Sequence, residues 1–364
     1  MKAKVRWVAA CLALLCLIMA GVREAQACTA FVLRGRDAVL LAKNLDWPVG
    51  DGYIFINKRK VEKKAFAVDP GAALRWTSRY GSVTFNQFGR EFPLGGINEV
   101  GLVIEELSGP AEYPPPDERP FLNELQWIQY HLDTCRSVKE VIKSDRALRI
   151  ARSLFKLHYL VADRKGNTAV IEFSGGKMVS YSGDGLKVPV LTNNDYPESL
   201  RYLGLHKGFG GDRAASNGPE SGERFVRAAT ALSELRWLGQ RAFVDDAFVT
   251  LRFVEQADTQ WSIAYSIPGR RIFFKTRAHR RYKIISLEDL DFSCESPVLM
   301  LPVNTEAAGN MSRSFVDYDG QKNRELLVSV FGQLKKAGEI DGQPADDIIQ
   351  KMADYPETCR CRLK

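Results

Sequence analysis

The residue with the clearest chemical potential is Cys28, which directly follows the small-x-small triplet Ala25-Gln26-Ala27. The chain before it opens with three basic residues among its first six and continues with an apolar run over 8–22. This is the layout of a secretory signal peptide, and it is too short and wrongly flanked for a membrane-spanning helix. We therefore expect cleavage after Ala27, with the mature protein, residues 28–364, in the periplasm or secreted.

Cleavage at this position would place a thiol and a free α-amino group on the same residue. An α-amine with a pKa of about 7.7–8.0 can accept the proton of a thiol with a pKa of about 8.5, so Cys28 would carry its own nucleophile and base. Two other uses are open: a disulfide, which is ordinary for an exported cysteine, or lipid attachment. Lipid attachment normally requires a leucine-like residue three positions earlier, where this chain has Ala25.

Composition limits the partners and the domain organisation. The chain has 364 residues, is 45% hydrophobic and carries a formal net charge of +7, which falls to about +4 without the leader. This mild, dispersed excess does not indicate nucleic-acid binding. After the leader, no apolar stretch is long enough to span a membrane, so we expect no stable membrane insertion. The Gly- and Ser-rich segment 204–222 is typical of a loop, and residues 28–364 are interpreted as a single catalytic domain.

The cysteines of the mature chain are odd in number, so at least one thiol should stay unpaired in an oxidising compartment. We expect Cys28 to be that thiol. The remaining four permit three pairings, among which the sequence does not choose: Cys135, Cys294, Cys359 and Cys361. The closely spaced C-terminal pair has no matching second ligand pair, so no metal site is expected.

Hairpins at both ends of the mature chain, with helices between them, predict an α+β layered fold with antiparallel sheets. The expected hairpins join strands 28–33 and 38–42, 157–162 and 168–173, and 261–267 and 271–275. The expected helices cover 123–143 with a restart at Ser137, 221–238, 245–255, 322–336 and 344–352. No βαβ alternation and no glycine-rich phosphate loop is present.

Four further side chains stand where they could serve a terminal thiol. Asp46 ends the second strand of the first hairpin, and antiparallel pairing returns that strand end toward Cys28 and its α-amine. Asn193 follows an apolar strand, where its amide could donate to an oxyanion. Arg224 opens a helix after the long loop, where a surface salt bridge is the ordinary use, and Lys43 could be a strand-edge charge or a cation near the thiol.

The order of these segments resembles the choloylglycine hydrolase family of linear amide hydrolases, which includes penicillin V acylases and bile salt hydrolases. The matching segments are Cys28-Thr29, Asn44-Leu45-Asp46-Trp47, Asn98-Glu99-Val100-Gly101-Leu102, Leu191-Thr192-Asn193 and Arg224-Phe225-Val226-Arg227. The resemblance implies the Ntn-hydrolase fold, a four-layer αββα sandwich. It also implies no metal or organic cofactor and a homodimer or homotetramer.

Carried over residue by residue, the resemblance makes Cys28 the nucleophile and its α-amine the base. Asp46 would orient the α-amine, Asn193 would donate to the oxyanion and Arg224 would support the thiolate. The reaction would be hydrolysis of a linear amide of a small N-acyl substrate through an acyl group on sulfur, followed by attack of water.

Two positions depart from the family pattern. Bile salt hydrolases usually have arginine where this chain has Lys43. Lysine supplies the positive charge but not the planar guanidinium group that can form a bidentate contact. A further oxyanion residue, commonly Asn or Tyr in the family, falls at Ser108 by counting forward from the Asn98 segment. Glu105 and Glu106 resemble an acid/base pair, but neighbouring strand residues point to opposite faces, so they are assigned no chemistry.

The leader favours an exported amidase for penicillin V-like substrates or long-chain N-acyl homoserine lactones over one for conjugated bile salts. From other classes, a non-catalytic exported binding protein and a lipoprotein acylated at Cys28 remain alternatives. The chain's histidines, none in a cysteine-protease context, are interpreted as packing or surface residues: His131, His158, His206 and His279.

Overall fold

The computed structural model describes residues 28–35, 38–67, 73–151, 154–237, 244–340 and 346–362. The expected leader, residues 1–27, lies outside these ranges, as do the tip of the first turn at 36–37, Leu238 and the first two residues of the last expected helix. Within the described ranges, no helix is both long and apolar enough to cross a membrane.

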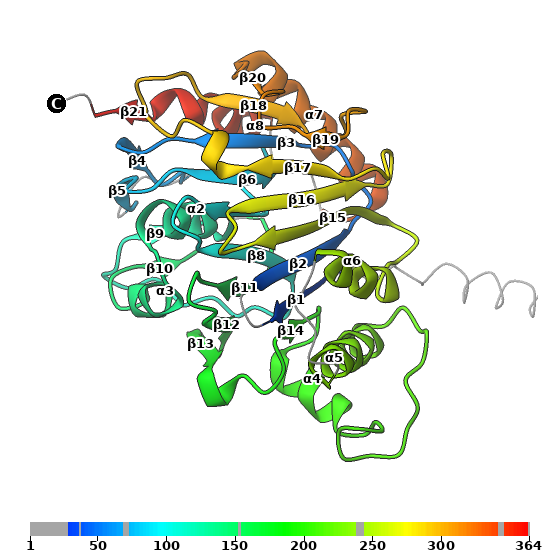
Figure 1. The fold of residues 1–364 in the computed structure, drawn as a ribbon. Helices are drawn as coiled ribbons and strands as arrows, with labels where there is room; N and C mark the ends of the chain where they lie inside the picture. The colour runs from blue at the N-terminus through cyan, green and yellow to red at the C-terminus, as the bar shows by residue number, and fades with distance from the viewer. Residues whose placement is uncertain are drawn as a thin grey trace, which may run out of the picture.

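Two mainly antiparallel sheets form the centre of the molecule (Figure 1). In spatial order, the described strands of the first sheet are β14 (Val190–Leu191), β1 (Thr29–Arg34), β2 (Val39–Asp46), β15 (Thr259–Ser266), β16 (Arg271–Thr276), β17 (Lys283–Ser286) and β19 (Gly309–Asn310). Those of the second sheet are β13 (Lys177–Ser182), β12 (Thr168–Ser174), β11 (Leu157–Ala162), β8 (Val103–Ser108), β7 (Gly95–Asn98), β6 (Ser82–Asn86), β3 (Tyr53–Asn57), β18 (Leu299–Pro302) and β20 (Val316–Asp317).

Helices cover the outer face of each sheet, which makes four layers. On the first sheet, α5 (Ser221–Trp237) contacts β1 and β14, and α6 (Val244–Phe253) contacts β2 and β15. On the second sheet, α2 (Glu124–Thr134) contacts β7 and β8, while β1 contacts β8 and β11 across the sheet interface. Figure 1 shows α6 and α2 on opposite sides of the stacked sheets. The layered α+β fold expected from the sequence is confirmed.

The remaining described elements are short or peripheral. The helices are α3 (Val138–Ser144), α4 (Tyr196–Leu203), α7 (Gly320–Ala337) and α8 (Asp346–Asp354), with 3₁₀ turns at Gly183–Gly185, Leu287–Asp289 and Tyr355–Thr358. Two small sheets pair β9 (Phe121–Leu122) with β10 (Arg149–Ile150), and β21 (Arg360–Cys361) and β5 (Arg75–Thr77) with β4 (Val61–Lys64).

The central strands are apolar because both of their faces are covered. In β1 every residue except the last is buried, and in β2 every residue except the first. The segment of β1 therefore reads as a nearly continuous apolar run, whereas β2 is apolar over 39–42 and then carries buried polar side chains at Lys43, Asn44 and Asp46. The three expected hairpins are confirmed by the pairings β1–β2, β11–β12 and β15–β16. The restart inside 123–143 is also confirmed, since the Ser137 side chain accepts from the Glu140 N–H at the start of α3.

A disulfide joins Cys294 to Cys361, across 67 residues of sequence. Cys28, Cys135 and Cys359 are free thiols, so the expectation for Cys28 is confirmed. The disulfide lies next to the pairing of β21 with β4, because Cys361 is opposite Val61. The C-terminal segment is therefore attached both by a covalent bond and by strand pairing.

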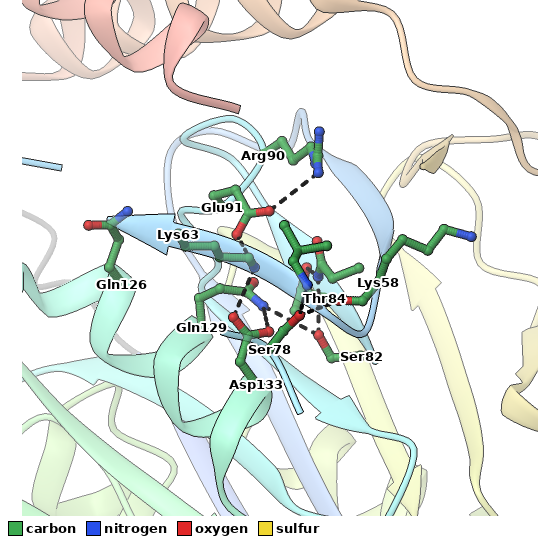
Figure 2. Close-up of polar contacts among 12 residues, drawn as sticks. Lys58, Lys63, Ser78, Ser82, Thr84, Arg90, Glu91, Gln126, Gln129 and Asp133 are labelled. Atoms are coloured by element: carbon green, nitrogen blue, oxygen red, sulfur yellow. Dashed lines mark hydrogen bonds and ion pairs between the residues drawn. The ribbon is translucent and has the colours of Figure 1, made fainter. Parts of the chain in front are cut away.

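A buried ionic cluster lies beside this attachment (Figure 2). The ammonium of Lys63, on β4, contacts Glu91 Oε2 at 2.5 Å and Asp133 Oδ2 at 2.9 Å. Asp133 also accepts from Trp76 Nε1 and Gln129 Nε2, each at 2.8 Å. Burial opposes the charge on Lys63, but the two carboxylates outweigh it and raise the pKa of the ammonium. The cluster links β4, α2 and the loop between β6 and β7 by charge.

Candidate active site

Strand register brings Cys28 and Asp46 together. Thr29 pairs with Asn44 in the β1–β2 ladder, so the residue before β1 lies beside the end of β2. Cys28 is buried, and its Sγ lies 4.0 Å from the backbone oxygen of Asp46. The hairpin therefore brings the two residues side by side as expected, while contact of the Asp46 carboxylate with an α-amine of Cys28 stays a prediction.

The carboxyl of Asp46 is buried, and only one of its two oxygens has a hydrogen-bond partner among the described residues. Its Oδ1 accepts a short hydrogen bond from the Thr259 hydroxyl, while its Oδ2 has no partner among the described residues. Thr259 Oγ1 itself accepts from the Gln256 N–H at 2.8 Å, so its proton is directed at Asp46. Burial raises the pKa of Asp46 to about 7, against the lowering effects of the Thr259 hydrogen bond and the Arg224 charge. The unpartnered oxygen of such a carboxyl suits a cationic group at residue 28.

The guanidinium of Arg224 forms hydrogen bonds with Cys28, Thr29 and Asn193. Its Nη1 donates to the carbonyl of Cys28 at 2.5 Å and to Thr29 Oγ1 at 2.7 Å, and its Nη2 donates to Asn193 Oδ1 at 2.8 Å. The side chain is almost completely buried, because α5 packs on β1 and β14. Arg224 thus has no surface role, and its hydrogen bonds hold the backbone of Cys28 and the side-chain amide of Asn193 in place.

Asn193 and Ser108 are joined by a hydrogen bond. With its oxygen held by Arg224, Asn193 directs its Nδ2 outward, where one N–H donates to the Ser108 carbonyl at 2.9 Å. The amide group has a second N–H that can serve an oxyanion. Ser108 therefore enters the site through its backbone carbonyl, as the group that holds Asn193. The expectation for a Ser108 hydroxyl or a nearby amide as a second oxyanion donor remains a prediction.

The expectations for Lys43, Glu105 and Glu106 need correction. Lys43 is fully buried, so it is no strand-edge charge, and its Nζ contacts Glu106 Oε1 at 3.0 Å and Glu105 Oε2 at 3.2 Å. The opposite-face argument was wrong here because Glu105 and Glu106 both reach this one ammonium between the sheets. Gly95 makes this possible, since a Cβ there would lie 2.2 Å from the Glu105 carboxyl.

The charges around Cys28 oppose one another. Burial raises the pKa of the Cys28 thiol to about 12, Lys43 acts to lower it, and Glu106 and Asp46 act to raise it. Burial likewise raises the pKa of Glu105 to about 6, against the effect of Lys43. Lys43 itself is held charged, because its two carboxylates outweigh the cost of burial and raise its pKa. A thiol in this setting stays protonated until a base beside it removes the proton.

A small, largely apolar pocket opens at the thiol. It is lined by Cys28, Leu45, Trp47, Gln87, Phe88, Leu94, Glu106, Ser108, Leu125, Phe155 and Leu157. Its volume is about 20 Å³, room for about one water molecule. The rings of Phe88 and Phe155 lie 4.9 Å apart, and Trp47 meets Phe155 edge-on at 6.4 Å. An acyl group can enter only if these rings move apart.

Sequence reasoning missed Thr259, the hydrogen-bond donor to Asp46. Its strand, β15, pairs with β2 so that Thr259 is opposite Asp46. The two residues are 213 positions apart, and no local pattern connects them. None of the four histidines lines the Cys28 pocket, which agrees with their interpretation as packing or surface residues.

A model of linear amide C-N hydrolases, the choloylglycine hydrolase family, matches residues 28–230. The chain belongs to this family. Among curated proteins, a penicillin V acylase from Pectobacterium atrosepticum is 28% identical over 225 residues, which cover 56% of this chain. The match spans 59% of that relative's length.

Solved structures of the choloylglycine hydrolase family share the fold along nearly their whole length. Penicillin V acylase from Agrobacterium tumefaciens superposes with a TM-score of 0.70 and 25% identity, covering 80% of this chain and 98% of that one. A variant of conjugated bile acid hydrolase from Clostridium perfringens gives a TM-score of 0.64 at 16% identity, covering 78% and 98%. The expected Ntn-hydrolase architecture with antiparallel sheets is confirmed.

Proposed function

We propose that the mature chain is an exported amidase that hydrolyses a linear N-acyl amide through an acyl group on Cys28. The observation that carries this proposal is the free, buried thiol of Cys28 beside Asp46, whose Oδ2 has no partner among the described residues. A free α-ammonium at residue 28 would give that carboxylate oxygen an ionic partner. The family match, which begins at residue 28, supports the same starting point.

The chemistry follows from the groups present. The α-amine of Cys28 takes the thiol proton, and the thiolate sulfur bonds to the amide carbonyl carbon. The resulting oxyanion accepts from Asn193 Nδ2. The C–N bond then breaks as the leaving nitrogen takes the proton from the α-ammonium. Water next gives a proton to the α-amine as its oxygen bonds to the thioester carbon. The C–S bond then breaks, which releases the carboxylic acid, and the sulfur takes the proton back from the α-ammonium to restore the thiol.

Leader removal is required by this scheme. While a residue precedes Cys28, its nitrogen is a peptide nitrogen, which is not a base. The buried thiol, with its pKa raised to about 12, then has no proton acceptor within its own residue. We infer that cleavage after Ala27 during export converts an inert precursor into the active enzyme.

For the acyl group, we propose a phenoxyacetyl-type substrate. The pocket at Cys28 is aromatic and aliphatic, through Trp47, Phe88 and Phe155, and aromatic rings pack well against one another. A rigid steroid would require a larger displacement of these rings than a phenoxyacetyl group does. A long-chain N-acyl homoserine lactone is the second candidate, because a flexible chain can pass between displaced rings.

The test uses the exported protein and two matched variants. Mass analysis should find an unmodified cysteine at the amino terminus. Cys28→Ala should abolish hydrolysis of penicillin V, whereas Cys135→Ala, at another buried free thiol, should leave the rate unchanged. A lipid-modified terminus, or a Cys28→Ala enzyme as fast as the wild type, would overturn the mechanism.

A substrate panel then tests the acyl preference separately. Penicillin V, a dodecanoyl homoserine lactone and a glycine-conjugated bile salt are compared by kcat/KM, since acyl preference is a property of the pocket. A higher value for the bile salt than for penicillin V would contradict the substrate assignment and leave the Cys28 mechanism intact.

A further inference from the structure

A cavity of about 1310 Å³ lies outside the catalytic pocket and shares no lining residue with it. Cavities of about 300–1,000 Å³ already hold drug-sized ligands. This one is lined by β1, α3, α5, the turn before β12, and the segment between the first 3₁₀ turn and β14. Nothing in the proposed amide hydrolysis uses it.

Cations outnumber carboxylates among the described residues that line this cavity, which include Arg34 of β1 and a single acid, Asp246 of α6. Lys139 and Lys143 are four residues apart and share a face of α3, and three more lining cations stand nearby in the sequence or fold: Arg146, Lys165 and Lys187. All five are exposed, and none forms an ion pair within the described ranges. Like charges that converge on one hollow repel one another and produce a positive field inside it.

Apolar side chains make up much of the rest of the lining. Ala229, Leu232 and Leu235 of α5 line it, and Val32 and Leu33 of β1 form part of its floor. Val138 and Ile142, again four residues apart on α3, extend the apolar surface beneath the cations. A molecule that fills this space would meet both hydrocarbon, chiefly from α5 and β1, and positive charge from α3 and its neighbours.

We propose that this cavity binds an anionic amphiphile, a long-chain carboxylate, with its head group at Lys139 and Lys143 and its hydrocarbon chain against α5. Charge complementarity excludes a cationic occupant, and the apolar wall excludes a small hydrophilic anion as the full ligand. The inference does not depend on the proposed amidase activity, because no residue of the Cys28 pocket takes part.

Calorimetric titration of the mature protein with sodium dodecanoate, below its micelle-forming concentration, tests the proposal. Dodecanoate should bind once per chain, with acetate and dodecyltrimethylammonium each weaker by about tenfold or more, since each lacks one of the two complementary parts. Equal binding of the cationic amphiphile would overturn the proposal.

Variants locate the bound molecule. Lys139→Glu with Lys143→Glu should weaken dodecanoate binding about tenfold or more, whereas Lys335→Glu with Lys336→Glu, the same charge change in the last turn of α7, should not. Ser233→Trp, at a half-buried lining position on α5, should abolish binding by filling the apolar side. Unchanged binding in either cavity variant would overturn the proposal.

Two further outcomes would also overturn it. If alkylation of Cys28 with iodoacetamide removes dodecanoate binding, the ligand occupies the catalytic pocket instead. If the Lys139→Glu, Lys143→Glu protein sediments as a smaller species than the wild type and the wild type binds no dodecanoate, the cavity is a surface between copies of the chain.

Discussion

Replacing Thr259 by valine removes the hydrogen bond to Asp46 while preserving side-chain shape. A hydrogen bond to a charged group contributes roughly 1.5–3 kcal/mol, and one pKa unit corresponds to about 1.4 kcal/mol. Because the Thr259 hydroxyl lowers the pKa of Asp46 against the effect of burial, Thr259→Val should raise that pKa by about 1–2 units.

The sign of the effect on activity follows from the role of the carboxylate. In the proposed mechanism Asp46 must be ionised to hold the α-ammonium, so activity should be lost as pH falls through its pKa. Without that cation burial puts the pKa at about 7; in the mature enzyme the α-ammonium lowers it. Thr259→Val should therefore shift the acidic limb of the pH profile of kcat/KM to higher pH by about 1–2 units. At pH values above that limb, kcat/KM of the variant should approach that of the wild type.

The assay is the pH dependence of kcat/KM for penicillin V, measured on protein with a verified free amino terminus. Thr259→Ser keeps the hydroxyl and serves as the control, with its acidic limb at the wild-type position. A uniform loss of activity at all pH values in Thr259→Val, or an equal shift in Thr259→Ser, would refute the reasoning.

Three other outcomes are expected. Arg224→Lys should lower kcat by about 10²-fold, because Asn193 loses the partner that orients its amide; single-turnover acylation rates check this, and an unchanged rate contradicts it. Lys63→Met should lower the free energy of unfolding in urea by about 3–5 kcal/mol, since two buried carboxylates lose their cation, while the neighbouring Lys64→Met should cost less than about 1 kcal/mol. Burial lowers the pKa of His131 to about 3, below its unfolded value of about 6.5. Stability should thus fall as pH drops through this window by up to about 1.4 kcal/mol per unit, and His131→Gln should flatten that slope in pH-dependent melts.

Local pattern was sufficient for most elements and for part of the site. The hairpin rule placed Asp46 beside Cys28, because a tight β1–β2 connection fixes which strand ends meet. The N-cap at Ser137 could also be predicted from the sequence, since it depends on neighbouring residues alone.

What the sequence could not supply was contact between distant strands. Asp46 meets its hydrogen-bond donor because β15 pairs with β2, and Lys43 meets the two carboxylates of β8 because the sheets stack. The periodicity of side chains within one segment does not predict either contact. The surface interpretation of Arg224 is common for a helix start, and only the packing of α5 on β1 reveals its burial. The disulfide from Cys294 to Cys361 was one of several equivalent possibilities for the same reason.

The hydrogen-bonded pairing of β1 with β14 places the sulfur-bearing end of one strand next to the segment that carries Asn193. Main-chain ladder geometry therefore sets how far the backbone of Cys28 stands from that of Asn193, the two residues that the proposed mechanism uses as nucleophile and oxyanion donor. By contrast, Phe88 and Phe155 belong to connections outside the strands. Redesign of those connections should change which compounds the protein accepts while its reacting groups keep their spacing, which makes them the first positions for engineering new substrate ranges.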